Sequence, residues 1–280
     1  MNIMYCGDNA MMDGLVISLM SITEHVSEPL NIYVLTATIK TAQKSYEPLS
    51  YEQAIYLDEL VKGENPASSV ELVDITDIFN VHVPIANMNT RFTPNCMLRL
   101  YADLVPQIPD RVLYLDTDVI CRENFRDMYS QDLTGHELAG ILDYYGSWFF
   151  KRNYLKLTRD YLNSGVLLLN MKYIRETGLF AQCRIRCQTK QMFMPDQSAL
   201  NKLCATKLVL KRRYNEQRRL HKNTVFQHFT TTFRFFPTVR TVTVKPWDVD
   251  RVHSELGLHE YDELLEKYEQ LSHDLEVLNN

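Results

Sequence analysis

Short apolar runs alternate with amphipathic segments along the first half of the chain, and this alternation constrains the fold more than any other feature of the sequence. The apolar runs, rich in β-branched and aromatic residues, lie at 2–6, 31–36, 69–75 and 111–116. Segments with helical periodicity lie between them, at 12–26, 48–62 and 95–105. The pattern predicts an α/β sheet whose first half, of about 115 residues, is organised like a nucleotide-binding unit.

The second half continues with strand-like runs, helical segments and short β-like pieces. The strand-like runs lie at 137–143 and 165–170, and the helical segments lie near 172–188 and 196–204. The short β-like pieces lie at 207–210, 224–229 and 239–244. We see neither an internal repeat nor a low-complexity linker in the sequence. One α/β domain with a C-terminal tail is therefore predicted.

The tail between 260 and 278 has apolar side chains at helical spacing among many acids. These side chains are Tyr261, Leu264, Leu265, Tyr268 and Leu271. The spacing predicts a helix that packs either on the domain or on a partner, which could be another copy of the chain. Its acidic face disfavours attachment to an anionic membrane.

Composition excludes several classes of partner. The formal net charge of −5 argues against nucleic acid, which needs a broad basic surface. No apolar run approaches the roughly 20 residues of a membrane span, and the N-terminus lacks the pattern of a signal peptide. The six cysteines are scattered without a Cys-x-x-Cys pair, so neither a disulfide framework nor a zinc knuckle is predicted. We expect a soluble, cytoplasmic protein.

Two acids close the apolar run at 112–115. In an extended segment, side chains at i and i+2 project to the same side, so Asp116 and Asp118 can address one ion if Thr117 points away. Carboxylate oxygens suit a hard divalent cation, and such an ion can bridge a diphosphate leaving group. Taken alone, Asp-x-Asp fits equally well a strand that ends in an acidic turn.

Several segments, in a fixed order, add to this pattern. They are CGDNA at 6–10, LRLYADLVP at 98–106, VLYLDTDV at 112–119, YLNSGVLLLN at 161–170, PDQSALN at 195–201, HF at 228–229 and KPW at 245–247. Over roughly residues 1–250 the chain thereby resembles the retaining glycosyltransferases of family eight, which include bacterial lipopolysaccharide galactosyl- and glucosyltransferases and glycogenin. The resemblance implies the GT-A fold, a single Rossmann-like α/β domain with a mixed central sheet that binds a nucleotide sugar.

The resemblance also implies a set of site residues. The implied ligands of Mn²⁺ are Asp116, Asp118 and His228, a set in which the histidine favours manganese over magnesium. The implied donor-binding residues are Asp8, Asn9, Arg99, Asp116, Thr117, Asp143, Asn163, Ser164 and Gly165. The implied catalytic residues are Asp196 and Gln197, near the anomeric carbon, and Lys245, which would neutralise the departing diphosphate.

Each assignment has a structural alternative. Asp8 and Asn9 resemble the residues that hold uracil and ribose, yet either could cap a helix. Arg99 could bind the donor or form an ion pair with Asp103 one turn later. A lone histidine such as His228 often has a structural role, and its position before KPW is what favours a metal ligand.

One segment departs from the family pattern. The family has a glycine soon after the histidine and a lysine a few residues later, whereas the 229–244 segment is longer and contains no glycine. Its alternating TVRTVTV stretch, at 238–244, predicts a β-hairpin that returns Lys245 to the phosphate. Lys245 is consequently the assignment that depends most on tertiary structure.

The resemblance implies transfer of galactose or glucose from a UDP-sugar to a hydroxyl of a glycan acceptor. The sequence shows no basic or membrane-binding tail, which disfavours a lipid-linked acceptor and leaves a glycan on a protein, such as a surface glycoprotein, as the expected acceptor. Because the amide Gln197 is a poor nucleophile, attack on the same face as the leaving group is favoured over a covalent intermediate. Residues 1–250 are predicted to form the catalytic domain, with a nucleotide-binding half at 1–118, a sugar and acceptor half at 119–250, and a helical extension at 251–280. A sugar-nucleotide nucleotidyltransferase and a non-catalytic nucleotide-sugar-binding protein are the alternatives.

Overall fold

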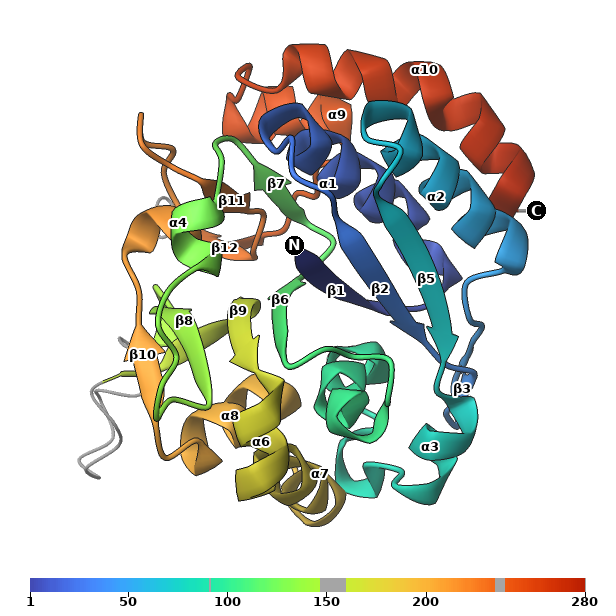
Figure 1. Cartoon of the computed structure of the whole chain (residues 1–280). Helices are drawn as coiled ribbons and strands as arrows, with labels where there is room; N and C mark the ends of the chain where they lie inside the picture. The colour runs from blue at the N-terminus through green and yellow to red at the C-terminus, as the bar shows by residue number, and fades with distance from the viewer. Residues whose placement is uncertain (91, 147–159, 235–239, 280) are drawn as a thin grey trace.

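The structure is a computed structural model that describes residues 1–90, 92–146, 160–234 and 240–279 (Figure 1). Its centre is a seven-stranded sheet with the strand order β10-β8-β9-β6-β1-β2-β5. These strands are β1 (Asn2–Gly7), β2 (Asn31–Thr36), β5 (Ser69–Asp74), β6 (Arg111–Leu115), β8 (Leu138–Leu142), β9 (Leu162–Asn170) and β10 (Lys207–Val209).

The sheet is mixed because one strand runs against its neighbours. Strands β5, β2, β1 and β6 are mutually parallel, whereas β9 is antiparallel to both β6 and β8. The start of β9 therefore meets the carboxyl end of β6, through the pair Leu115 and Val166. The chain passes from β1 outward to β2 and β5 and then returns to β6 on the other side of β1, so the strand order reverses between β1 and β6. Open α/β sheets bind ligands at the carboxyl ends of the strands beside such a reversal of strand order, so this edge is the expected place for a site.

Helices cover both faces of the sheet (Figure 1). One face carries α1 (Met12–His25), α2 (Tyr51–Glu64) and α10 (Asp262–Asn279). The other carries the 3₁₀ helix η3 (Pro94–Leu104), α6 (Met171–Thr177), α7 (Leu179–Thr189) and α8 (Pro195–Leu203). Shorter helices complete the chain: η1 (Asn9–Met11), α3 (Thr76–Val81), η2 (Ile85–Asn87), α4 (Arg126–Tyr129), η4 (Arg212–Tyr214), α9 (Val249–Arg251) and the π-helical turn η5 (Val252–Leu256).

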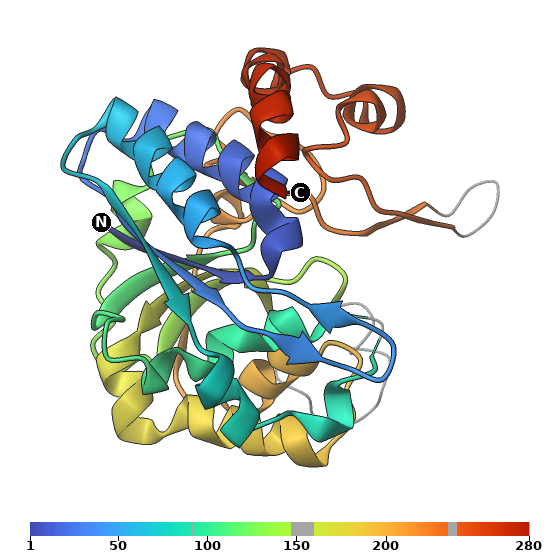
Figure 2. The ribbon, with the colours of Figure 1, turned by 90° about the vertical axis from the view of Figure 1, so that its right-hand side faces the viewer.

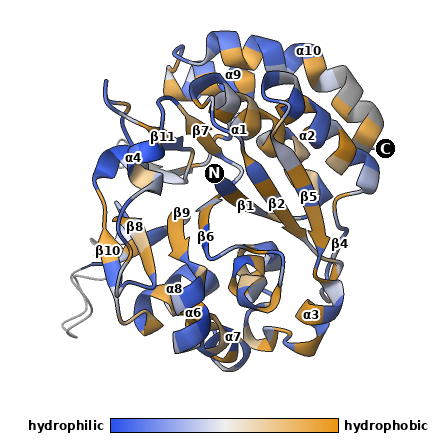
Figure 3. Cartoon of the chain, viewed as in Figure 1, coloured by the Kyte–Doolittle hydropathy of each residue, from blue (hydrophilic) through white to orange (hydrophobic). Residues whose placement is uncertain are grey.

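The period-two alternation of the strands explains the two cores. On β6, Leu113 and Leu115 belong to the core under α1, while Val112 and Tyr114 belong to the core under η3. All four side chains are almost completely buried, and the β2 and β9 ribbons are hydrophobic over most of their length (Figure 3). A strand buried on both faces is expected to be apolar throughout, which is why these runs were recognisable in the sequence.

Small sheets lie beside the central one. They consist of β3 (Ile39–Lys40) with β4 (Ser45–Tyr46), β7 (Val119–Cys121) with β11 (Phe226–His228), and β12 (Thr232–Arg234) with β13 (Arg240–Val242). The last pair is antiparallel and projects from the body of the molecule (Figure 2). It confirms the hairpin predicted from TVRTVTV for the described residues, while 235–239 lie outside them.

The C-terminal helix packs on its own domain. Tyr261, Leu264, Leu265 and Tyr268 are buried in the core that also contains α1, so the predicted packing of this helix on the domain is confirmed. The Tyr268 hydroxyl also donates to Asp13 Oδ1 at 2.9 Å. Among the described residues, no helix combines the length and the apolar composition that crossing a bilayer requires.

Local structure differs from the sequence prediction in three places. The segment predicted as helix at 95–105 is a 3₁₀ helix, and the one near 172–188 is divided at Gly178, whose φ of 68° ends α6. The assumption that Asp116 and Asp118 lie on one extended strand is wrong, because β6 ends at Leu115 and a turn follows before β7. The two acids are brought together by this turn.

Candidate functional site

Two acids and one histidine meet where β6 and β11 end and β9 begins. One ligand atom from each of Asp116, Asp118 and His228 lies within 4.8 Å of the other two. His228 Nε2 is 3.1 Å from Asp118 Oδ1 and 3.6 Å from Asp116 Oδ2. Donor atoms that share one octahedral ion at a bond length of about 2.1 Å lie about 3 Å apart. Two carboxylates and one imidazole at these separations fit a single divalent cation.

Gly165 leaves the space in which these groups meet. A Cβ atom at this position would lie 2.1 Å from His228 Cε1 and 2.7 Å from Asp116 Oδ2. The Gly165 carbonyl also accepts a hydrogen bond from the Asp116 backbone N–H at 2.8 Å. Position 165 therefore requires glycine because the acid and the imidazole approach the backbone too closely for any side chain.

Asp116 is held by one carboxylate oxygen and presents the other to the cluster. Its Oδ1 accepts from Arg99 Nη2 at 2.9 Å and from the Tyr114 hydroxyl at 2.6 Å. Burial alone would lower the pKa of Arg99, but the neighbouring Tyr114 and Asp116 raise it well above its ordinary value. Arg99 thus stays cationic and fixes the Asp116 carboxylate, whose Oδ2 faces His228.

Asp118 forms an ion pair with Lys245. The lysine Nζ donates to Asp118 Oδ2 and, at 3.3 Å, to the carbonyl of Phe229. Burial raises the pKa of Asp118, but the ammonium group of Lys245, together with the neighbouring His228, outweighs burial and leaves that pKa below its ordinary value. The β12 and β13 hairpin therefore brings the Lys245 ammonium group back to the acids, although 16 positions separate it from Phe229.

A chain of hydrogen bonds fixes the His228 tautomer. The Gly165 backbone N–H donates to Asn163 Oδ1 at 2.9 Å, so that atom must be the amide oxygen. Asn215 Nδ2 donates to the same oxygen at 2.9 Å, which directs Asn215 Oδ1 to His228 Nδ1 at 3.3 Å. The proton of a neutral His228 then lies on Nδ1, and the Nε2 lone pair faces the two acids, as a metal ligand requires.

We expect Asn215→Ala to lower the affinity of this site for Mn²⁺ by about 10- to 100-fold, the usual effect of losing the partner that orients a histidine ligand. Asn215 is fully buried, so thermal unfolding should be measured beside Mn²⁺ titration. Asn80→Ala, which changes an exposed asparagine of α3, is the matched control. Equal Mn²⁺ affinities in the two variants would contradict the orienting role.

Beside the acids lies a cluster of buried polar side chains. Asp143 Oδ2 accepts from Asn163 Nδ2 at 3.0 Å and from Gln197 Nε2 at 3.2 Å. Gln197 Oε1 accepts from the Ser164 backbone N–H at 2.9 Å. Asp143 Oδ1 in turn accepts from the backbone N–H groups of residues 145 and 146, so protein donors occupy both oxygens. Both ends of the Gln197 amide are engaged, which fixes its orientation.

Asp196 has unused hydrogen-bonding capacity. It is 4% exposed and follows Pro195 in the first turn of α8. Its Oδ2 lies 3.4 Å from Arg99 Nε but has no hydrogen-bond partner among the described residues. Since buried carboxylate oxygens are normally paired, this oxygen is suited to accept a hydrogen bond from a ligand hydroxyl.

The remaining predicted residues lie around this centre. Asp8 caps η1 by accepting from the Ala10 N–H at 3.2 Å, and Asn9 beside it is exposed at the carboxyl end of β1. Thr117 packs against Gly14 of α1, where a Cβ would lie 2.8 Å from the Thr117 carbonyl oxygen. The alternative pairing of Arg99 with Asp103 is wrong, because Asp103 instead forms an ion pair with Arg184.

Two supporting residues were not identified from the sequence. The role of Tyr114 could have been predicted, because a buried tyrosine hydroxyl needs a hydrogen-bond partner. Tyr114 precedes Asp116 by two positions on an apolar strand, and Asp116 is that partner. Asn215 had none, because it lies in a basic stretch far from His228 and Asn163 along the chain. Only the packing of η4 against β11 places it there.

Comparison with known proteins agrees with this arrangement. The family model "Glycosyl transferase family 8" matches residues 2–248. A probable glycosyl transferase Gly from Streptococcus gordonii is 30% identical over 99 residues, which are 35% of this chain and 13% of that protein. A putative glycosyltransferase from Haemophilus influenzae is 20% identical over 219 residues, covering 74% of this chain and 60% of that protein. The chain thus spans less than two thirds of these relatives.

A solved structure shows the same fold. The galactosyltransferase LgtC, in complex with donor and acceptor sugar analogues, superimposes with a TM-score of 0.65 at 19% sequence identity. The match covers 95% of this chain and 96% of that one. The mixed central sheet predicted from the sequence is therefore confirmed as the GT-A fold.

Proposed function

The chain belongs to glycosyl transferase family 8, and from this premise we propose that it transfers a hexose from a UDP-sugar to a hydroxyl of a glycan acceptor, with retention of the anomeric configuration. The observation that carries the proposal is the convergence of Asp116, Asp118 and His228 around Gly165. Three ligands of mixed oxygen and nitrogen type lie beside two cations, Arg99 and Lys245, and beside a cluster of buried polar side chains. This arrangement suits a metal-bound diphosphate attached to a sugar.

The residues present fit Mn²⁺, with Asp116 Oδ2, an Asp118 oxygen and His228 Nε2 as its ligands. When bound, the ion supplies positive charge that stabilises the diphosphate as a leaving group. Lys245 is proposed to exchange its Asp118 partner for a phosphate oxygen when the donor enters. Because Lys245 is one third exposed, it can make that change by a side-chain rotation.

The donor sugar is proposed to lie against the cluster of buried polar side chains. Asp196 Oδ2, which lacks a hydrogen-bond partner among the described residues, would accept from a sugar hydroxyl. Asp143, Asn163 and Ser164 would contact the sugar. Hydrogen bonds join Asn163 to Asp143, and Gln197 to both Ser164 and Asp143, which holds these groups in place before the donor binds. Arg99 fixes Asp116 and so shapes the wall next to the diphosphate. The uracil and ribose would lie near Asp8 and Asn9, at the end of β1.

Retention follows from attack on the face that the diphosphate leaves. The bond between the anomeric carbon and the phosphate oxygen breaks, and the acceptor oxygen bonds to the same face. The departing phosphate oxygen takes the acceptor proton. Gln197 is proposed to lie on the opposite face, where its amide, engaged by Ser164 and Asp143, cannot form a covalent intermediate with the sugar. Positioning and charge stabilisation then supply most of the rate enhancement.

We also propose that successive parts of the chain have different roles. Residues 1–118 would bind the nucleotide, residues 119–250 the sugar and acceptor, and residues 251–280 would support the catalytic domain as a helical extension. The donor is proposed to be UDP-galactose or UDP-glucose, and the acceptor a glycan, such as one on a surface glycoprotein.

We expect UDP release from UDP-galactose or UDP-glucose, in the presence of Mn²⁺, to exceed release in the presence of chelator by at least about 100-fold. A panel of UDP-sugars, with UDP measured as the product, tests this expectation. A chain that binds UDP-sugars without releasing UDP would instead be a non-catalytic binding protein. Release of pyrophosphate from UTP and a sugar phosphate would identify a nucleotidyltransferase.

A further inference from the structure

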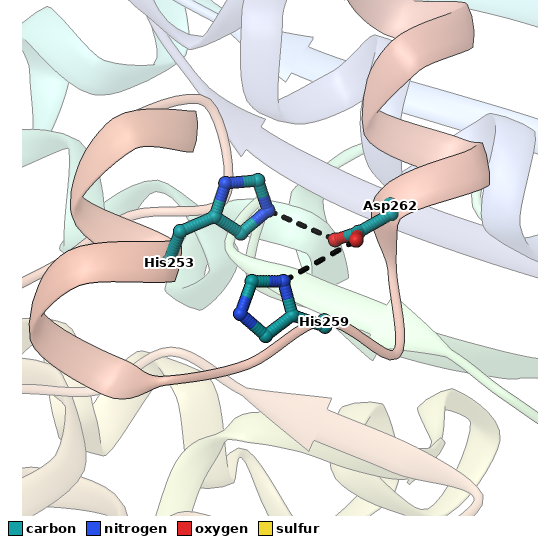
Figure 4. Close-up of side chains that lie close together, drawn as sticks. All are labelled: His253, His259 and Asp262. Carbon is teal, nitrogen blue, oxygen red and sulfur yellow. Dashed lines mark hydrogen bonds and ion pairs between the residues drawn. The ribbon is translucent and has the colours of Figure 1, made fainter.

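A second group of potential metal ligands lies in the C-terminal segment and shares no residue with the site described above. It consists of His253 in the turn η5, His259 in the loop that follows, and Asp262 at the start of α10 (Figure 4). Both imidazoles point toward the same carboxylate. His253 Nε2 is 2.9 Å from Asp262 Oδ1, and His259 Nδ1 is 3.3 Å from Asp262 Oδ2.

The type and spacing of these donors suit a borderline transition metal. One ligand atom from each residue lies within 4.8 Å of the other two. Around a tetrahedral Zn²⁺ ion with bonds of about 2.0 to 2.1 Å, donor atoms lie about 3.3 Å apart. Two imidazole nitrogens and one carboxylate form a ligand set used for Zn²⁺, with water in the fourth position. The hard-ion chemistry of magnesium and calcium does not match two nitrogen donors.

The backbone around the three residues is well supported. Val252, beside His253, is completely buried, and Arg251 binds Glu255 at 2.6 Å across the same turn. Gly257 then reverses the chain with a φ of 63°, a conformation that brings His259 back toward His253. A single π-helical turn is uncommon in proteins and occurs often at functional sites.

The imidazole rings can adjust to an ion. They stack with centroids 4.8 Å apart and an interplanar angle of 15°. The side chain of His253 is 34% exposed and that of His259 is 66% exposed, so solvent can supply the remaining ligand. Rotation about the broad χ2 torsion turns each nitrogen lone pair toward a common centre without moving the backbone.

We propose that His253, His259 and Asp262 bind one Zn²⁺ ion that clamps the turn η5 to the start of α10. The clamp has a structural consequence near the catalytic centre. Tyr261, adjacent to Asp262, donates its hydroxyl hydrogen bond to the side chain of Gln227, the residue before His228. Zn²⁺ bound at 253–262 therefore stabilises the docking of α10 on the domain, independently of the function proposed above.

The test must separate this site from the first group. In a full-length, tag-free chain with Asp118→Asn and His228→Ala, calorimetric titration with Zn²⁺ is expected to detect one bound ion. Adding His253→Ala and His259→Ala is expected to weaken binding by more than about 100-fold, because two of three ligands are lost. The control adds His136→Ala and His221→Ala instead, which removes two histidines elsewhere and should leave binding unchanged.

A more conservative variant separates loss of Zn²⁺ binding from loss of folding. Asp262→Asn keeps the shape of the side chain and is expected to lower Zn²⁺ affinity by at least about tenfold. In the otherwise native chain, Zn²⁺ should raise the melting temperature more than in the His253→Ala, His259→Ala variant, since binding to the folded state stabilises it. The proposal is overturned if the Asp118→Asn, His228→Ala background binds no Zn²⁺. It is also overturned if the histidine variant and its control bind Zn²⁺ equally.

Discussion

Asp118→Asn is expected to lower hexose transfer by roughly a thousandfold or more and to remove Mn²⁺-dependent binding of UDP. Asp118 lies next to both His228 and Lys245, so the amide removes one metal ligand and leaves the lysine without its carboxylate partner. The substitution keeps the size of the side chain, and the fold is expected to persist. UDP release and Mn²⁺ titration measure the effect, and Asp116→Asn should behave in the same way.

The matched control for this change is Asp127→Asn. Its side chain is 84% exposed and lies 3.7 Å from Arg213, so an isolated surface pair is all that it removes. Activity and Mn²⁺ affinity should stay close to those of the native chain. If Asp118→Asn and Asp127→Asn both retained full transfer activity, the assignment of the metal ligands would be wrong.

Gly165→Ala is expected to disrupt the same centre by steric overlap alone. The added methyl group would lie 2.1 Å from a His228 ring carbon and 2.7 Å from Asp116 Oδ2, so one or both ligands must move. Mn²⁺ affinity should fall by at least about 100-fold because the donors no longer converge, and stability should fall by about 1 to 3 kcal/mol through overpacking. Mn²⁺ titration and urea unfolding measure the two effects.

Gly63→Ala tests whether the effect depends on position. Gly63 lies in α2, and apart from its chain neighbours and the backbone of its own helix, no described atom lies within 4 Å of the Cβ that would be added. Alanine is a better helix former than glycine, so this variant should be as stable as the native chain or more stable by about 0.5 to 1 kcal/mol. Its Mn²⁺ affinity should not change. Similar Mn²⁺ affinities in the two glycine variants would refute the steric argument at Gly165.

The two groups of ligands also predict different responses to metals. The first combines two carboxylates with one imidazole, whereas the second combines two imidazoles with one carboxylate. Mn²⁺ should therefore prefer the first group, and Zn²⁺ binding should persist at the second when the first is removed. This difference allows the catalytic proposal and the Zn²⁺ proposal to fail separately.

Much of the fold could be predicted from the sequence because its signals are local. The strands at 2–6, 31–36 and 111–116 have central residues that pack on both faces of the sheet, so those central residues are apolar. The order of the motifs predicted family membership, which the match over residues 2–248 confirms. The resemblance likewise brought Asp116, Asp118 and His228 together as one set, and the structure places them within 4.8 Å.

The sequence by itself determined the alternation of elements, the family and the residue types of the site. Only the tertiary structure decided how these residues are paired. Arg99 binds Asp116, which follows β6, and not Asp103, which is nearer in the sequence but forms an ion pair with Arg184. Asn215 orients His228, and the hairpin returns Lys245 to Asp118. Strand and helix patterns arise from residues that are close together in the sequence, so they can be recognised from the sequence alone. Hydrogen-bond partners depend on which distant segments the fold packs together.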